Sequence, residues 1–156
     1  MPIPEQPPSS PDTEAGRARA VRGLALAARS LEQAAGDITL AQYRVLAFVA
    51  AGAERSSLVA RGLALAKATV NAAVDGLVER DLIIREAVEG DRRSVRLAVT
   101  PAGAAALQAA EHSMSERLDR VLEHAADPDA LIAALCDLDD ALAARVKTRL
   151  RGQVPS

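Results

Sequence analysis

The sequence predicts a mainly α-helical protein with one small β-hairpin, and three observations lead to this fold class. Residues 67–80 place apolar side chains at the i, i+3, i+4, i+7 spacing of a buried helical face. Residues 82–88 and 94–99 are rich in branched side chains and alternate as half-buried strands do. A charged turn, residues 89–93, joins these two runs. Helix, turn, helix and then a hairpin with a basic tip form a winged helix-turn-helix, which reads duplex DNA with one helix in the major groove.

Four segments follow one another along the chain. Residues 1–11 are rich in proline and predict a disordered N-terminal arm. Residues 12–38 predict a first helix that ends near a glycine and serves dimerisation. Residues 39–99 form the winged helix-turn-helix, and residues 100–152 predict two C-terminal helices that also serve dimerisation.

The helices of the winged segment have recognisable starts. Thr39, followed three residues later by Gln42, is a capping box that opens the first of them. Either Ser56 or Ser57 is expected to cap the short second helix. The recognition helix follows Ala66, which has no side-chain oxygen and therefore no capping bond to offer.

The outward face of the recognition helix carries the candidate base contacts. Asn71 can bond an adenine edge through two hydrogen bonds, and Thr69 can donate or accept one. Neighbouring basic and hydroxyl side chains suit phosphate oxygens, which position the protein without specifying sequence. Asp75 and Glu79 lie on the same face, where they would repel phosphates. The candidate DNA-binding residues of the two helices are Ser56, Ser57, Arg61, Lys67, Ala68, Thr69, Asn71 and Ala72.

The turn between the strands carries the candidate wing contacts. Arg92 and Arg93 at a hairpin tip fit a narrow, A·T-rich minor groove, where the negative potential is concentrated. Asp91 is placed to orient one of them through a charge-assisted hydrogen bond. Arg85 and Arg96 lie on the polar phase of the strands and could reach the DNA backbone. The alternative reading of this turn is a charged loop that only faces solvent.

The sequence also resembles a known family. The run VARGLALAKATVNAAVDGLVERDLI, followed by GDRRSVRLAVTPAG, is similar to the core of the MarR-type transcriptional regulators over residues 40–107. The resemblance implies a dimeric winged-helix regulator, usually a repressor, often released from DNA by a small aromatic or phenolic ligand or by oxidation. It also implies that Asp91 orients Arg93 in the wing.

The chain departs from this family pattern at both ends of the recognition helix. The turn and cap usually read Gly-Leu-Ser, whereas this chain has Ala64, Leu65 and Ala66. The position after the helix is usually a glycine in the left-handed conformation, and here it is Asp81. Because an alanine at an N-cap costs about 1 kcal/mol, we expect a less stable recognition helix.

The C-terminal helices predict a homodimer. Thr100 and Pro101 begin a helix that extends to about residue 126, and Pro128 begins the last helix, which extends to about residue 151. Apolar residues recur along the last helix at near-heptad spacing, so it needs a surface to pack on. A two-fold partner that joins through the terminal helices supplies one. The candidate dimerisation residues are Val21, Leu24, Leu131, Leu135, Leu138, Leu142 and Val146.

Length and charge fit one DNA-binding domain. The chain has 156 residues and a net charge of −2, which argues against indiscriminate binding to nucleic acid. Residues 40–99 carry nine basic and seven acidic side chains, so the excess of acid lies in the flanks. Tyr43 and Phe48 are the only aromatic residues, which leaves little surface on which a planar effector could stack.

Other classes of protein are disfavoured. His112, His124 and Cys136 do not have the spacing of zinc ligands, and no catalytic constellation is present, so we expect neither an enzyme nor a cofactor. Cys136 lies in a helical stripe, where buried packing is preferred over redox sensing, and a single cysteine forms no internal disulfide. No apolar run spans a bilayer and the N-terminus is not a signal peptide, which predicts a cytoplasmic protein without a membrane partner.

Two functions follow from the sequence. The first is a dimeric, sequence-specific DNA-binding transcriptional regulator, a repressor on a pseudo-palindromic operator in double-stranded DNA, relieved by a small-molecule effector of the aromatic or phenolic kind. The alternative is a winged-helix protein-interaction module that has lost DNA binding. Ala66, Asp75 and Glu79 are the evidence for this alternative.

Overall fold

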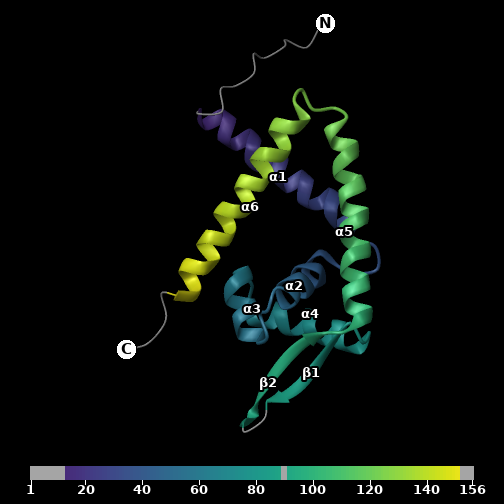
Figure 1. Ribbon diagram of the computed structural model, residues 1–156. Coiled ribbons are helices and arrows are strands. Elements are labelled where there is room, and N and C mark those ends of the chain that lie inside the picture. Colours follow the sequence, from purple (N-terminus) through teal and green to yellow (C-terminus); the bar gives the residue numbers. More distant parts are fainter. Residues whose placement is uncertain (1–12, 89–90, 152–156) are drawn as a thin grey trace, which may run out of the picture.

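The computed structural model describes residues 13–88 and 91–151, with side chains for residues 13–87 and 95–149. Over these residues the chain forms six helices and one two-stranded sheet, which confirms the predicted fold class (Figure 1). The elements are α1 (Glu14–Ala34), α2 (Leu40–Ala50), α3 (Ser56–Leu63), α4 (Lys67–Glu79), β1 (Ile83–Val88), β2 (Asp91–Val99), α5 (Pro101–Leu122) and α6 (Pro128–Arg151).

The core lies where α2, α3 and α4 meet the base of the β1–β2 hairpin. The apolar face predicted for the recognition helix, α4, is buried as a unit, and Ala110 and Met114 of α5 join the same core. Burial of this face fixes which side of α4 remains exposed, because residues off the stripe must point away from the core. The side chains of the core that are fully buried include Val45, Leu46, Val59, Val70, Val74, Leu77 and Ile83.

The N-terminal cap of α2 is as predicted from the sequence, whereas that of α3 is not. The Gln42 backbone N–H donates to Thr39 Oγ1 at 3.1 Å and the Thr39 N–H donates to Gln42 Oε1 at 3.0 Å, which is the predicted capping box. The prediction of a serine cap for α3 is wrong, because the N-cap is Arg55 and no side chain caps that helix. Backbone N–H groups one turn later donate to the Arg55 carbonyl, so Ser56 is already the first helical residue.

Two residues without glycine's freedom adopt the left-handed conformation. Ala64, in the turn between α3 and α4, has φ 52°, and Asp81, just after α4, has φ 55°. These are the turn and the post-helix position where the sequence departs from the family pattern. A non-glycine residue in this region is strained by a contact between Cβ and the carbonyl oxygen, so both ends of α4 carry a conformational cost.

The wing is an antiparallel hairpin that the core holds only at its base. Arg85 pairs with Leu97 and Glu86 with Arg96, and the register becomes irregular near the turn. Leu97 is 3% exposed, whereas Val95, two residues nearer the tip, is 47% exposed because it extends beyond the helices. The hairpin thus projects away from the helical body at its lower edge (Figure 1).

The junction between the wing and α5 depends on close packing. Thr100 caps α5 by accepting from the Gly103 backbone N–H at 2.9 Å, and its own hydroxyl donates to the Asp81 carbonyl at 2.6 Å. A Cβ on Gly103 would lie 2.0 Å from the carbonyl oxygen of Leu82, so only glycine fits there. The base of the wing, the end of α4 and the start of α5 therefore form one unit.

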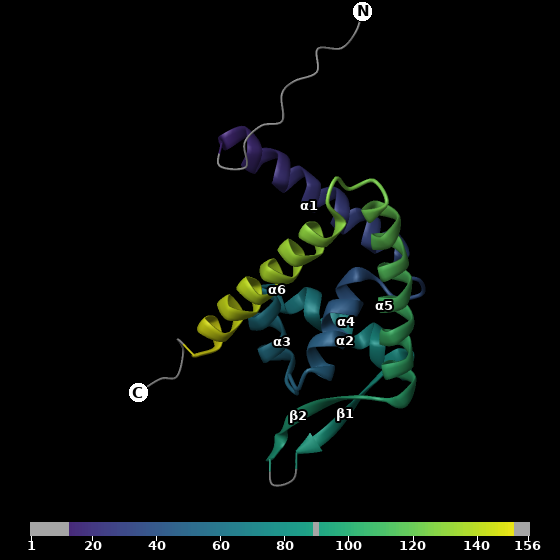
Figure 2. The ribbon, with the colours of Figure 1, turned by 45° about the horizontal axis from the view of Figure 1, so that its top comes forward.

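Helix α5 runs from the base of the wing to the opposite end of the molecule, where α6 begins, and α1 packs against α5 (Figures 1 and 2). Arg117 of α5 donates to the Ser30 hydroxyl of α1 at 2.8 Å, and α6 turns back from α5 so that it packs on α3. Leu138 and Leu142 of α6 are nevertheless 37% and 50% exposed. Cys136 is exposed as well, in contrast to the buried position that the sequence predicts.

Among the described residues, none of the helices combines the length and the hydropathy needed to cross a lipid bilayer.

Candidate nucleic-acid interface

The N-terminal half of α4 presents a continuous exposed face. Lys67, Ala68, Thr69, Asn71 and Ala72 are all exposed, because the residues between them on the helix are packed into the core. This helix begins at Ala66, whose backbone is extended (φ −61°, ψ 140°) and which makes no side-chain capping bond. The first-turn N–H groups of α4 are therefore left to solvent or to a ligand, and such groups favour anions.

The candidate phosphate contacts on α3 lie beside this face. Ser57 and Arg61 are exposed and Ser56 is half-buried. Gly62, on the other side of α3, is buried so tightly that a Cβ there would lie 2.1 Å from the Phe48 ring. This close approach holds α3 against α2 and leaves the serine and arginine side of α3 outward.

The predicted wing tip is only partly described. Asp91, Arg92 and Arg93 belong to the backbone of β2, but their side chains lie outside the described residues. Their proposed contacts with the minor groove therefore stay a prediction. The described part of the hairpin fixes only where the tip begins relative to α4.

Arg85 of β1 reaches back to the recognition helix. Its Nη2 donates to Asp75 Oδ1 of α4 in an ion pair. From the sequence, Asp75 was expected on the outward face, where it would repel phosphates, and Arg85 was expected to contact the DNA backbone. The structure joins these two charges to each other, so each cancels much of the other's field.

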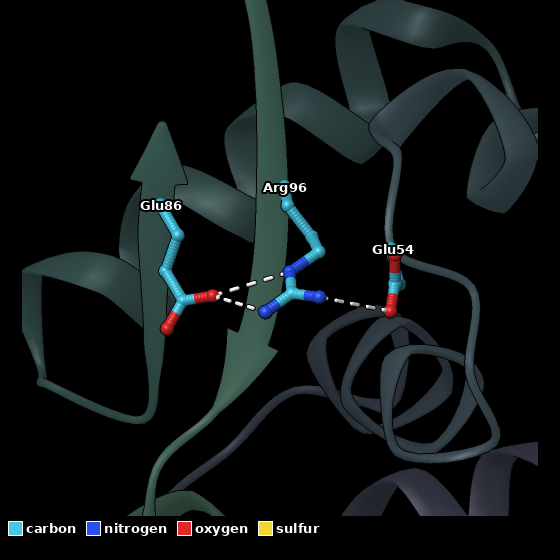
Figure 3. Close-up of polar contacts among 3 residues, drawn as sticks. All are labelled: Glu54, Glu86 and Arg96. Atoms are coloured by element: carbon cyan, nitrogen blue, oxygen red, sulfur yellow. Dashed lines mark hydrogen bonds and ion pairs between the residues drawn. The ribbon is translucent and has the colours of Figure 1, made fainter. Parts of the chain in front are cut away.

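Arg96 of β2 lies between two carboxylates (Figure 3). Its Nε and Nη2 donate to Glu86 Oε2 at 3.2 and 2.8 Å, and its Nη1 lies 3.5 Å from Glu54 Oε1 in the loop before α3. The hydrogen bond to Glu86, with the charges of Glu54 and Glu86, raises the pKa of Arg96 above its usual value. The Leu97 N–H also donates to the Glu54 carbonyl at 2.7 Å, so the loop is joined to β2 by backbone and side chain.

Sequence reasoning did not identify Glu54 and Glu86 as members of this region. For Glu86 the sequence contained a usable pattern, because an antiparallel hairpin in this register places its opposite charge directly across from Arg96. Glu54 gave no such signal, because its approach to β2 depends on how the loop after α2 folds back.

Two clefts flank the core on the α5 side. One, of about 420 Å³, lies where α2 ends and β2 passes into α5. The other, of about 220 Å³, lies between the α1–α2 loop and α5, where Arg80 Nη1 donates to the Asp37 carbonyl at 2.7 Å. In the described part of the chain, no group of three metal-ligating side chains comes together.

Part of this chain matches the sequence model of a known protein family. The sequence pattern of the MarR family matches residues 36–94, which contain α2, α3, α4 and the start of the wing. The resemblance to MarR-type regulators is thereby confirmed over this region. No curated protein matches the chain by sequence.

Solved structures of two transcriptional regulators have a similar fold. The repressor CouR bound to a 23-mer DNA duplex is 25% identical, with a TM-score of 0.65 over 82% of this chain and 93% of that one. CouR from Rhodococcus jostii RHA1 bound to p-coumaroyl-CoA is 23% identical, with a TM-score of 0.64 over 86% and 95%. A MarR-family regulator from Rhodococcus sp. RHA1 is 22% identical, with a TM-score of 0.70 over 85% and 96%.

Proposed function

We propose that this chain, whose winged helix matches the MarR family, is a homodimeric transcriptional repressor that binds a pseudo-palindromic operator and is released by a small-molecule effector. One observation carries the proposal. The exposed half of α4 that offers Lys67, Thr69 and Asn71 lies beside a projecting hairpin, the arrangement with which winged helices bind duplex DNA.

The recognition helix reads bases with few polar groups. Asn71 bonds an adenine edge, Thr69 donates or accepts one bond, and Ala68 and Ala72 meet thymine methyl groups. Lys67 and the α3 side chains bind phosphate and set the register. Asp91, Arg92 and Arg93 of the wing extend the contact into the adjacent minor groove.

Apolar side chains that this chain leaves exposed support the proposed homodimer. Large exposed hydrophobic residues lie on the terminal helices, Val21 and Leu24 on α1 and Leu138 and Leu142 on α6. Leu131, Leu135 and Val146, the other members of the α6 stripe, are half-buried within the chain. Exposed large apolar side chains suit an interface, and a two-fold partner would cover them while presenting two recognition helices to one duplex.

The effector is proposed to enter the larger cleft. Its volume of about 420 Å³ is within the range of small-molecule sites, about 300–1,000 Å³. Val99, Thr100 and Pro101 line it, and these residues connect the wing to α5. A ligand in this cleft would act on the base of the wing, which is where a small displacement changes the position of the tip.

Selection from random-sequence duplex DNA tests the proposal. The unmodified protein should enrich a palindromic sequence, and its binding constant should fall steeply with salt concentration. Asn71→Ala should reduce the ratio of specific to non-specific binding by about 5- to 150-fold with little change in the salt slope. Lys67→Ala should lower the slope of log K against log salt by about 0.9 and leave sequence preference intact.

The rival function, a protein-interaction module, keeps two observations in its favour, and the first is that α4 begins at Ala66 without a side-chain cap. Glu79 is an exposed acid on the recognition helix, and no contact among the described residues neutralises it. Asp75, in contrast, no longer supports this rival, because Arg85 pairs with it. Failure of the unmodified protein to enrich any sequence would favour the interaction module.

A further inference from the structure

We propose that Arg85 and Arg96 are positioning residues that hold the wing at a set angle to the recognition helix and do not bind phosphate. This inference rests on the proposed function, since it concerns how the wing and α4 meet the same duplex. It also reassigns two arginines that the sequence alone places among the DNA contacts.

Arg85 joins the wing to α4 from the inner side of the hairpin. Because side chains alternate along a strand, Arg85 shares a face with its cross-strand partner Leu97 and with Ile83, both of which are buried. It lies one step beyond the buried part of that face, where α4 passes, and it reaches Asp75 there. Asp75 is four residues after Asn71, so the ion pair lies about one helical turn from the main base reader.

Arg96 joins the wing to the loop before α3 from the outer side. Its guanidinium holds Glu86 of β1 through two nitrogens and approaches Glu54 of the loop through a third (Figure 3). One side chain therefore spans both strands and the segment that leads into α3. With Arg85, the wing is joined to α4 on one face of the hairpin and to the loop before α3 on the other.

These pairs are suited to orientation more than to stability. All five side chains are partly exposed, and isolated ion pairs at a protein surface contribute little to unfolding free energy. The planar guanidinium of Arg96, bonded through several nitrogens, does, however, impose direction on the groups it joins, and Arg85 adds one charge-assisted bond to α4. The core contacts the hairpin only at its base and one backbone bond joins Leu97 to Glu54, so beyond that point the angle of the hairpin depends on these ion pairs.

The carboxylates also argue against a phosphate role. Asp75 shields Arg85, and two carboxylates surround Arg96, so a phosphate would have to displace an existing partner in each case. The net charge of the Glu54–Arg96–Glu86 group is negative, which gives a phosphate no attraction at that point.

The experiment uses the full-length protein and a duplex that the unmodified protein enriches from random-sequence DNA. Binding is measured for that duplex and for one in which the flanking base pairs near the wing are replaced by G·C, at several salt concentrations. The variants are Arg85→Gln, Arg96→Gln, Asp75→Asn and the charge exchange Asp75→Arg with Arg85→Asp. Arg29→Gln, which removes an exposed ion pair of α1 (Arg29–Glu32, 3.8 Å), is the matched control.

We expect each of the three single variants to lose about tenfold in discrimination between the two flanks, with the salt slope unchanged. The charge exchange should restore discrimination, and Arg29→Gln should behave as the unmodified protein does. Asp75→Asn breaks the ion pair but keeps Arg85, so it distinguishes the two candidate roles of this arginine. If Arg85 positions the wing, the variant should lose flank discrimination. If Arg85 binds phosphate, the variant should bind every sequence more tightly.

Two results would overturn the inference while leaving the proposed function intact. One is a fall of about 0.9 in the salt slope for Arg85→Gln or Arg96→Gln, which marks a direct phosphate contact. The other is unchanged flank discrimination in Asp75→Asn. If the unmodified protein enriches no duplex at all, the proposed function itself is wrong, and the inference falls with it.

Discussion

Replacing Ala66 with threonine should stabilise the protein, because α4 begins without a side-chain cap. Helices α1, α2 and α5 each begin at a threonine whose side chain accepts from the backbone N–H three residues later. Ala66 has the same extended backbone as those threonines, with φ −61° and ψ 140°. The introduced hydroxyl would accept from the N–H of Thr69 with no change in backbone conformation.

The size of the effect follows from known caps. A capping side chain in place of alanine is worth about 1 kcal/mol, within a range of about 0.5–2 kcal/mol. For a domain of this length, about 1 kcal/mol raises the melting temperature by roughly 2–4 °C. The gain should be local to α4, since the substituted position is exposed and displaces no packed atom.

Thermal and urea unfolding at one fixed protein concentration measure this difference. Ala66→Val is the matched control, because valine has the shape of threonine without the acceptor oxygen. We expect a higher melting temperature for the threonine variant alone. Equal melting temperatures for the two variants would show that the hydroxyl makes no cap and that the reasoning about α4 is wrong.

Three other changes have definite outcomes. Gly103→Ala should lower the unfolding free energy by about 1–3 kcal/mol or more in urea titrations, since a methyl group would lie 2.0 Å from a carbonyl oxygen; an unchanged midpoint would contradict this. Leu138→Asp together with Leu142→Asp should yield monomers in light scattering, and surviving dimers would place the interface elsewhere. The pKa of Tyr43 is raised from 10.0 by burial and then by two carboxylates, one of them Asp139, so its ionisation reduces stability only above pH 10.0. Tyr43 lies in α2 and Asp139 in α6. In an absorbance titration of this single tyrosine, Asp139→Asn should therefore lower the pKa of Tyr43. An unchanged pKa would show that α6 does not lie close enough to α2 for this interaction.

Several features of the fold could be predicted from short stretches of sequence. The buried face of α4, the capping box at Thr39 and the start of α5 at Pro101 all depend on residues within one or two turns of each other. The left-handed position after α4 was also visible as a departure from a family pattern, at Asp81, whereas the left-handed conformation of Ala64 was not expected. Local periodicity and capping chemistry are enough for such predictions.

Other features could not be predicted in this way. Adjacent serines offered two equivalent caps for α3, yet the N-cap is the residue before them, Arg55, and Ser56 is already helical. Cys136 lies in an apolar stripe and was expected to be buried, but α6 packs on α3 in a way that leaves this cysteine exposed. In both cases the outcome depends on where a neighbouring element lies, which the local pattern does not contain.

By itself, the sequence determined that this chain is a winged helix-turn-helix, because helical and strand periodicities are properties of neighbouring residues. It also determined which residues of α4 face outward. Only the tertiary structure decided the role of the exposed charges. Arg85 meets Asp75, and Arg96 meets Glu86 and Glu54, because β1 passes α4 and the loop before α3 lies along β2. Pairing between charges at a surface depends on distances between separate elements, and those distances exist only once the chain has folded.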